Sequence, residues 1–274
     1  MKNIEMKKYK TVLSIAGSDS GGGAGIQADI KTISACGCFT TTAITAITVQ
    51  NTLGVSNVFP IPGNILEEQI DSVLSDIGAD AIKIGMLHSS NIIHRVSKML
   101  SKYEIRNVVL DPVMLATSGD VLLKNEAINA LKNDLIPKVR VITPNIPEAE
   151  VLSGSKIKSH ADVLNCAKEL ANEYKVSVLL KAGHMNSSEL IDVFYNFENQ
   201  ERLEMKSNKI DSVNTHGTGC TMSSAFAAFL ARGYDLQSAA LQAKRYINEA
   251  IKAGADYEIG QGHGAVKHFY KFWE

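Results

Sequence analysis

Residues 214–228 combine a thiol with the residues that build an anion-binding loop. Gly217 and Gly219 flank Thr218 and precede Cys220, and an alanine-rich run typical of a helix follows. Glycines adopt backbone angles closed to other residues, and a helix start presents unpaired N–H groups at the positive end of the helix dipole. Such a loop can bind a phosphate or a developing oxyanion, and it favours a thiolate. Cys220 is therefore a candidate base or nucleophile, unless it is simply a small packed residue.

Further polar residues stand where predicted strands end or a predicted helix begins. Asp111 precedes a proline and could hold Mg²⁺ or the waters of that ion, although Asp-Pro is also a common turn. Glu148 follows Pro147 near a helix start and is a second candidate metal ligand, or simply complements the helix dipole. Lys181 could meet a phosphate or be solvated. Gln50 offers a donor and an acceptor, which suits the edge of a heteroaromatic ring, but a solvated strand end explains it equally simply.

These positions depend on alternating strands and helices. Helical patterns separate β-forming apolar runs, which occupy residues 11–16, 39–50, 81–85, 107–110, 139–142 and 176–180. We therefore expect a mainly parallel sheet, with an antiparallel pair at residues 190–197 and 202–206. Ligands of such sheets bind beyond the carboxyl ends of the strands, where Gln50, Met86 and Asp111 lie. No linker or charge block divides the chain, so a single α/β domain is expected over residues 1–274.

A glycine-rich loop follows the first predicted strand. It contains GxGxxA as Gly23, Gly25 and Ala28, which suggests a dinucleotide site. However, residues 30–66 contain no Asp or Glu that could bind the ribose, and no Gly-Lys-Ser/Thr follows to make a Walker A loop. The loop is therefore expected to serve another ligand, and the carboxylates on either side of it, Asp19 and Asp29, could bind a polar substrate.

Composition excludes several classes of partner. The chain has 274 residues, with 28 basic against 29 acidic residues, so no global field favours nucleic acid or an anionic membrane. No apolar run approaches the roughly 18 residues of a membrane span, and the N-terminus lacks the apolar core of a signal peptide. Four cysteines show no spacing typical of a metal site. We expect a cytoplasmic protein that binds a small molecule.

Together these parts fit phosphoryl transfer without a P-loop. That reaction needs phosphate positioning, charge neutralisation by Mg²⁺ and cations, and a base for the attacking hydroxyl. A dinucleotide oxidoreductase would lack its ribose acid, and a thiol acyltransferase would use Cys220 as a nucleophile. A non-catalytic binding module leaves the Cys220 loop, Asp111 and Glu148 unexplained together.

The chain also resembles the hydroxymethylpyrimidine/phosphomethylpyrimidine kinases from end to end. The matching motifs occur in the family's order and comprise residues 14–29 (SIAGSDSGGGAGIQAD), 49–51 (VQN), 82–87 (IKIGML), 111–114 (DPVM), 143–148 (TPNIPE), 180–184 (LKAGH), 216–220 (HGTGC) and the tail motif GHG…HF. The resemblance implies a ribokinase-like fold, a three-layer α/β/α sandwich, usually as a homodimer. It also implies two ATP-dependent phosphorylations in thiamine biosynthesis, of 4-amino-5-hydroxymethyl-2-methylpyrimidine and then of its monophosphate.

The same resemblance assigns roles to individual residues. Cys220 takes the position at which related sugar kinases carry an aspartate base, and Gly217, Thr218 and Gly219 form the anion hole. The residues expected around the pyrimidine are Gly17, Asp29, Gln50, Met86 and Val113. Those expected to face ATP and Mg²⁺ are Asn145, Glu148, Lys181 and Lys244.

A pyridoxal or pyridoxine kinase of vitamin B6 salvage is the nearest alternative, because pyridoxal also presents a hydroxymethyl group on a six-membered nitrogen ring. Some related enzymes of that kind carry a lid cysteine after Asp-Pro-Val-Met that captures the aldehyde. Residues 115–118 here read Leu-Ala-Thr-Ser, without cysteine. This favours the pyrimidine as substrate and leaves pyridoxal open.

Overall fold

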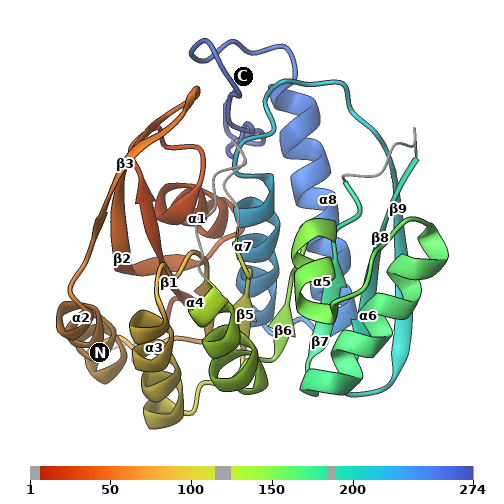
Figure 1. The fold of residues 1–274 in the computed structure, drawn as a ribbon. Coiled ribbons are helices and arrows are strands. Elements are labelled where there is room, and N and C mark those ends of the chain that lie inside the picture. Colours follow the sequence, from red (N-terminus) through yellow and green to blue (C-terminus); the bar gives the residue numbers. More distant parts are fainter. Residues whose placement is uncertain (1–6, 115–124, 184–188, 274) are drawn as a thin grey trace, which may run out of the picture.

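A computed structural model describes residues 7–114, 125–183 and 189–273. Within these ranges, one sheet contains nine strands in the order β3-β2-β1-β4-β5-β6-β7-β8-β9 (Figure 1). Its parallel strands are β2 (Phe39–Asn51), β1 (Thr11–Asp19), β4 (Ala81–Ile84), β5 (Val108–Leu110), β6 (Val141–Ile142) and β7 (Ser177–Leu180). Three antiparallel strands complete the two edges, namely β3 (Gly54–Pro60), β8 (Glu189–Asn196) and β9 (Glu201–Asn208).

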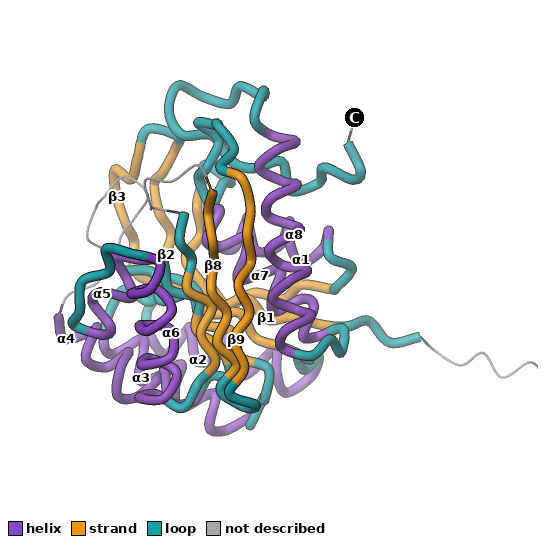
Figure 2. The backbone as a smooth tube through the Cα atoms, turned by 90° about the vertical axis from the view of Figure 1, so that its right-hand side faces the viewer, coloured by secondary structure: helices purple, strands orange, loops and turns teal. Residues whose placement is uncertain are grey.

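Helices cover both faces of this sheet (Figure 2). On one face lie α2 (Gly63–Asp76), α3 (Ser90–Tyr103), α4 (Asn125–Ala130), α5 (Ile146–Ser153) and α6 (His160–Tyr174). On the other lie α1 (Gly25–Ala35), α7 (Thr218–Ala231) and α8 (Leu236–Gly254). Each layer buries its own apolar cluster against the sheet. The predicted three-layer α/β/α sandwich with a mainly parallel sheet is therefore confirmed.

The alternation of side chains explains why the central strands are apolar throughout. In β4, Ala81 packs toward α7 and α8, whereas Ile82 and Ile84 pack toward the opposite helices. Successive side chains of a strand point to opposite faces, so a strand covered on both faces must be apolar at every position. Lys83 is the exception within β4, where it is fully buried and forms an ion pair with Asp29; Ser14 in β1 and Ser177 in β7 are also buried polar residues.

Two local features differ from the sequence-based expectation. Strand β3 was not predicted, because it is a short edge strand with mostly exposed side chains between Gly54 and Pro60. The helical pattern expected between the strands at 107–110 and 139–142 includes α4, which is followed by a π-helical turn, Leu131–Leu135. The antiparallel pair β8 and β9, by contrast, confirms the prediction. None of the described helices has both the length and the apolar character needed to cross a bilayer.

The C-terminal segment packs its first part under α7 and α8 and leaves its end exposed. The imidazole of His268 is buried, with its Nε2 3.1 Å from the Thr221 hydroxyl. The Tyr246 hydroxyl donates to the His268 carbonyl at 2.6 Å, whereas Phe272 and Trp273 are exposed. Burial lowers the pKa of His268 to about 4, so the ring is neutral and accepts from Thr221.

We predict that the buried His268 makes the fold sensitive to acid. Between pH 6.5 and about 4 the unfolded chain binds a proton at His268 that the folded protein refuses, so stability falls as the pH falls. The loss should reach roughly 3 kcal/mol across this window. Urea unfolding at pH 7 and pH 4.5 measures it. His268→Gln keeps an acceptor for Thr221 and should show a smaller loss; an equal loss in parent and variant contradicts the prediction.

Candidate active site

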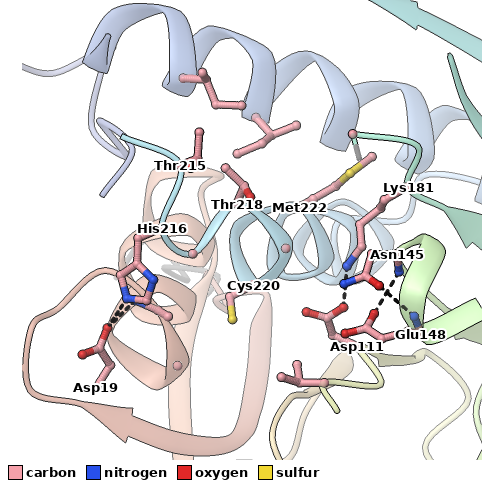
Figure 3. Close-up of a pocket in the computed structure, with 18 of the residues that line it drawn as sticks. Asp19, Asp111, Asn145, Glu148, Lys181, Thr215, His216, Thr218, Cys220 and Met222 are labelled. Atoms are coloured by element: carbon pink, nitrogen blue, oxygen red, sulfur yellow. Dashed lines mark hydrogen bonds and ion pairs between the residues drawn. The ribbon is translucent and has the colours of Figure 1, made fainter. Parts of the chain in front are cut away.

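One cavity of about 620 Å³ lies beyond the carboxyl ends of the parallel strands, at the start of α7. All of the predicted site residues fall in the described ranges, and all except Asp29 line this cavity. Figure 3 shows Cys220 in the middle, with His216 and Asp19 on one side and a lysine–carboxylate cluster on the other. The residues singled out in the sequence, Asp29 excepted, therefore lie around one pocket.

The start of α7 is fixed by a close approach between two loops. Gly217 has a left-handed backbone with φ of 78°, and a Cβ there would lie 1.8 Å from the Gly23 carbonyl oxygen. Any larger residue would push the loops apart, so glycine is required. Thr218, Gly219 and Cys220, in the first turn of α7, consequently line the cavity. A helix start leaves N–H groups without intrahelical partners, as an anion hole requires, although the Thr218 N–H already donates to the Thr215 carbonyl at 3.3 Å.

The Cys220 thiol lies between two helix starts. The backbone N–H of Gly25, the first residue of α1, bonds the sulfur from the other side. Burial nevertheless raises the pKa of Cys220 to about 11, with Lys83 lowering it and Asp29 and Asp111 raising it further. The expectation that the helix start favours the thiolate is therefore outweighed by burial in the unliganded protein, where the thiol is protonated at neutral pH.

Asp29 and Lys83 form a buried pair, of which Lys83 lines the cavity and Asp29 does not. Lys83 Nζ lies 2.8 and 2.9 Å from the two Asp29 oxygens, and Ser14 and Ser224 each donate to the same carboxylate at 2.6 Å. Ser224 follows Cys220 by one helical turn, so the pair lies beneath the thiol. The Asp29 carboxylate thus bonds to buried groups of the protein itself. The expected contact between Asp29 and the substrate stays a prediction. Sequence reasoning missed Lys83, although a lysine inside a buried strand was the available signal.

On the other side of Cys220, three carboxylate and lysine groups meet. Lys181 Nζ donates to Asp111 Oδ1 at 2.7 Å, and the Thr143 hydroxyl donates to the same oxygen at 3.0 Å. Asn145 caps α5, because its side chain accepts from the Glu148 N–H at 2.9 Å while Glu148 accepts from the Asn145 N–H at 2.8 Å. Burial raises the pKa of Glu148 to about 7, an effect that Lys181 opposes and Asp111 reinforces.

This cluster offers oxygen ligands of the kind that Mg²⁺ prefers. Among the described residues, Asp111 Oδ2 has no hydrogen-bond partner, and it would lie 3.4 Å from a Cβ at Gly219. No group of three or more His, Cys, Asp or Glu side chains meets within the described ranges. Mg²⁺ usually takes one or two carboxylates and completes its shell with water and substrate phosphates. Asp111 and Glu148 fit that kind of site.

Lys244 reaches the cavity from α8 and is also paired. Its Nζ donates to Asp192 Oδ2 at 2.8 Å, and the Ala182 N–H donates to the other oxygen of Asp192 at 2.7 Å. Asp192 lines the cavity but was missed by sequence reasoning. Its signal was an acidic residue within the apolar run Leu190-Ile-Asp-Val-Phe.

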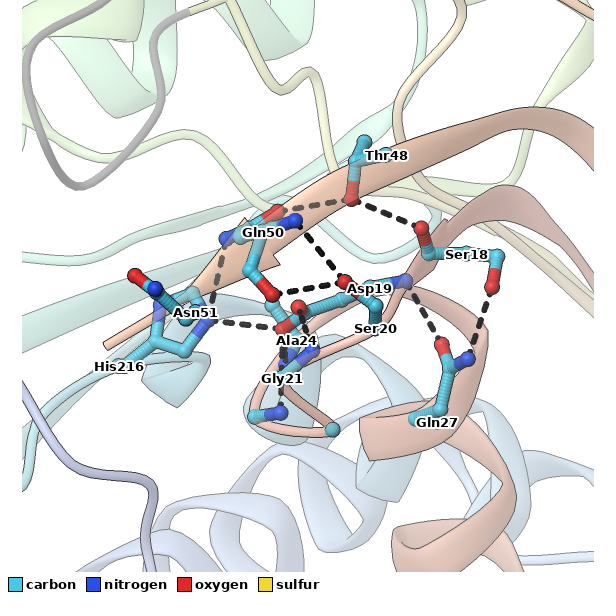
Figure 4. A network of polar contacts seen from close by, with 12 residues as sticks. Ser18, Asp19, Ser20, Gly21, Ala24, Gln27, Thr48, Gln50, Asn51 and His216 are labelled. Carbon is cyan, nitrogen blue, oxygen red and sulfur yellow. Dashed lines mark hydrogen bonds and ion pairs between the residues drawn. The ribbon is translucent and has the colours of Figure 1, made fainter. Parts of the chain in front are cut away.

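Gln50 belongs to a polar network at the end of β2 (Figure 4). The Thr48 hydroxyl donates to Gln50 Oε1 at 3.0 Å, and Gln50 Nε2 lies 3.3 Å from His216 Nε2. That same His216 nitrogen lies 2.9 Å from Asp19 Oδ2. Burial raises the pKa of Asp19, but hydrogen bonds from His216 and from the N–H groups of Gly21 and Ala24 lower it by more. The net effect is a lowered pKa, so the carboxylate is ionised. His216 Nε2 therefore carries a hydrogen and donates a hydrogen bond to Asp19 Oδ2.

The remaining predicted residues form the wall beside Gln50. A Cβ at Gly17 would lie 2.8 Å from the terminal methyl group of Met86, so the glycine leaves the space that Met86 occupies. The Thr45 hydroxyl donates to the Met86 carbonyl at 2.9 Å and fixes the backbone there. Val113 lines the cavity after β5. The side chains of Met86 and Val113 make this part of the lining apolar, and Gln50 lines the same cavity.

Comparisons with known proteins agree on one family. The family model described as phosphomethylpyrimidine kinase matches residues 19–267. A hydroxymethylpyrimidine/phosphomethylpyrimidine kinase of Rhizobium meliloti (strain 1021) is 45% identical over 263 residues, which cover 96% of this chain and 98% of the relative.

Solved structures similar to this chain include a phosphomethylpyrimidine kinase and a pyridoxal kinase. The phosphomethylpyrimidine kinase of Clostridium difficile 630 is 42% identical with a TM-score of 0.78, covering 88% of this chain and 99% of the other. An ADP complex of Bacillus subtilis pyridoxal kinase is 36% identical with a TM-score of 0.87, covering 95% of this chain and 98% of the other.

Proposed function

Because the chain belongs to the phosphomethylpyrimidine kinase family, we propose that it transfers the terminal phosphoryl group of ATP to 4-amino-5-hydroxymethyl-2-methylpyrimidine and then to the resulting monophosphate. These are the two kinase steps of thiamine biosynthesis expected from the sequence. One observation supports the proposal above all others. A single cavity brings together three features. They are Gln50, which can bind the edge of a heteroaromatic ring, the helix start at Cys220, which can bind an anion, and the lysine–carboxylate cluster around Asp111.

On the acceptor side, the wall of Met86 and Val113 holds the ring, and Gln50 recognises its edge. The hydroxymethyl group then points toward Cys220, which in its thiolate form takes the hydroxyl proton as the oxygen–phosphorus bond forms. Lys83 and the Gly25 N–H favour this thiolate. These two partners offset part of the cost of burial, which still leaves the thiol protonated in the unliganded protein.

On the donor side, the N–H groups from Gly217 to Gly219 stabilise the charge that develops on the transferring phosphoryl group. Lys181 and Lys244 supply cations near the phosphates, and Asn145 holds the start of α5 in place. Asp111 and Glu148 would hold Mg²⁺, which neutralises phosphate charge when bound.

We further propose that the protein is a cytoplasmic homodimer. The exposed surface of β2, the turn and β3 carries large apolar side chains, which a second copy would cover; they are Phe39, Ile47, Val49, Leu53 and Phe59. Pyridoxal remains the second candidate acceptor, which the likeness to the Bacillus subtilis pyridoxal kinase supports. Residues 115–118, whose lack of cysteine favours the pyrimidine, lie outside the described residues.

Mass spectrometry of reaction products tests the proposed function. Purified protein is incubated with Mg·ATP and, separately, hydroxymethylpyrimidine, its monophosphate and pyridoxal. We expect monophosphate from the first and diphosphate from the second. Pyridoxal phosphate as the sole product would move the activity to vitamin B6 salvage, and no product from any acceptor would refute the proposal.

Glu148 should make the magnesium requirement depend on pH. Because its carboxyl has a pKa of about 7, it is protonated at pH 6, and a metal ion must then displace the proton. The Mg²⁺ concentration for half-maximal activity should rise roughly tenfold from pH 8 to pH 6. Glu148→Gln can keep the helix cap and should need more Mg²⁺ at both pH values, with little pH dependence. Glu150→Gln, on the surface of the same helix, is the control; an unchanged titration in Glu148→Gln would remove Glu148 from the metal site.

A further inference from the structure

The tail motif Gly262-His-Gly264 is the one conspicuous sequence feature that the site description leaves without a role. Residues 259–265, here called the strap, follow α8 and a short connection. In Figure 1 this dark-blue part of the chain crosses the top of the molecule, toward the turn between β2 and β3. The strap therefore connects parts of the site that are far apart in sequence.

Its first attachment is to the turn that follows Gln50. The His263 N–H donates to the Thr52 carbonyl at 2.9 Å, and the Gly262 N–H donates to the Thr52 hydroxyl at 3.2 Å. A Cβ at Gly262 would lie 2.1 Å from the Thr52 carbonyl oxygen and 3.1 Å from the Leu53 nitrogen. The backbone of Gly262 is not left-handed, so its glycine is required by this close approach alone.

Its second attachment is to the loop that leads into α7. The His216 N–H donates to the Gly264 carbonyl at 3.0 Å, and His216 pairs with Ala265 in a parallel bridge. Asn214 donates to the carbonyls of Gly254 at 2.7 Å and Tyr257 at 2.6 Å, which fixes the chain just before the strap. The same short segment thus binds both the turn after Gln50 and the loop before Cys220.

The β2–β3 ladder alone does not fix Gln50. The register shifts between Val49 and Gln50, after which Gln50 pairs with Val55, and Ser20 holds the backbone of Gln50 in addition. The Gln50 N–H donates to the Ser20 hydroxyl at 2.9 Å, which donates back to the Gln50 carbonyl at 2.7 Å. Two residues further on, Thr52 is held by the strap. The distance between Gln50 and the loop before Cys220 therefore depends on the two attachments of the strap, to Thr52 and to His216.

We propose that Gly262 and Thr52 are positioning residues that set the distance between the ring bound at Gln50 and the loop at Cys220. This distance decides the preference between the two acceptors. The proposal rests on the proposed function. In the first reaction the attacking atom is the hydroxymethyl oxygen. In the second it is a phosphate oxygen, one phosphorus and one oxygen atom further from the ring. The strap holds the turn after Gln50 close to the loop at Cys220, which favours the shorter acceptor. Displacing this turn should therefore lower kcat/KM more for the hydroxymethyl compound than for its monophosphate.

Gly262→Ala tests this directly, because its new methyl group must displace the turn. We expect kcat/KM for hydroxymethylpyrimidine to fall about 10- to 100-fold, the scale of a misplaced reactant, and that for the monophosphate to fall several times less. The KM for ATP should stay near the parent's value, whereas the melting temperature should fall, because the new methyl group meets backbone atoms of Thr52. Gln261→Ala, an exposed neighbour in the strap, is the matched control and should leave both acceptors unchanged.

Substitutions at Thr52 give a second test that does not depend on how Gly262→Ala folds. Thr52→Val removes the hydroxyl that binds the Gly262 N–H but keeps the side-chain shape, and should shift the preference in the same direction. Thr52→Ser keeps the hydroxyl and should restore the parent's ratio. Equal losses with both acceptors, a raised KM for ATP, or an unchanged ratio in both Gly262→Ala and Thr52→Val would overturn the inference. A parent protein inactive on both pyrimidines would instead refute the proposed function.

Discussion

Close packing of backbone against backbone at the glycine loops determines the whole site. Gly217 rests against the Gly23 carbonyl, and a Cβ at Gly25 would in turn lie 2.3 Å from the Gly17 carbonyl. Side chains at these positions would separate the starts of α1 and α7. Because they are absent, the N–H groups of two helix starts converge on Cys220, and Asp19 can accept from the loop while bound to His216. The missing side chains at these glycines, rather than any single strong bond, allow the candidate catalytic groups to lie close together.

Three lysine–carboxylate pairs also shape the charge of the cavity. Each lysine that lines the cavity from β4, β7 or α8 already has a carboxylate partner; the pairs are Lys83–Asp29, Lys181–Asp111 and Lys244–Asp192. Buried ions are stable only when they are paired, so these lysines and carboxylates depend on each other. A polyphosphate entering such a balanced site binds best together with a cation that compensates the carboxylates. This explains why the donor set suits a Mg²⁺ complex of ATP better than a free anion.

The sequence predicted what depends on local pattern. Strand ends and a glycine loop before a helix place Gln50, Met86, Asp111 and Cys220 at one edge of the sheet, and the family resemblance supplied their expected roles. What could not be predicted depends on strand order and register. Asp29 binds Lys83 because β1 lies between β2 and β4, and Lys244 binds Asp192 because α8 crosses β8. The strap likewise depends on a turn more than 200 residues away in the chain.

The claim that Cys220 acts as the base is tested most directly by the kcat of Cys220→Ala with hydroxymethylpyrimidine at saturating Mg·ATP. Cys166→Ala, which removes a buried thiol in α6 away from the cavity, serves as the control. The account predicts that Cys220→Ala lowers kcat by roughly 10²- to 10⁴-fold, the usual range for a lost general base, while the control stays near the parent. A kcat for Cys220→Ala within a factor of about two of the parent's, far below that range, would contradict the account and remove Cys220 from the mechanism.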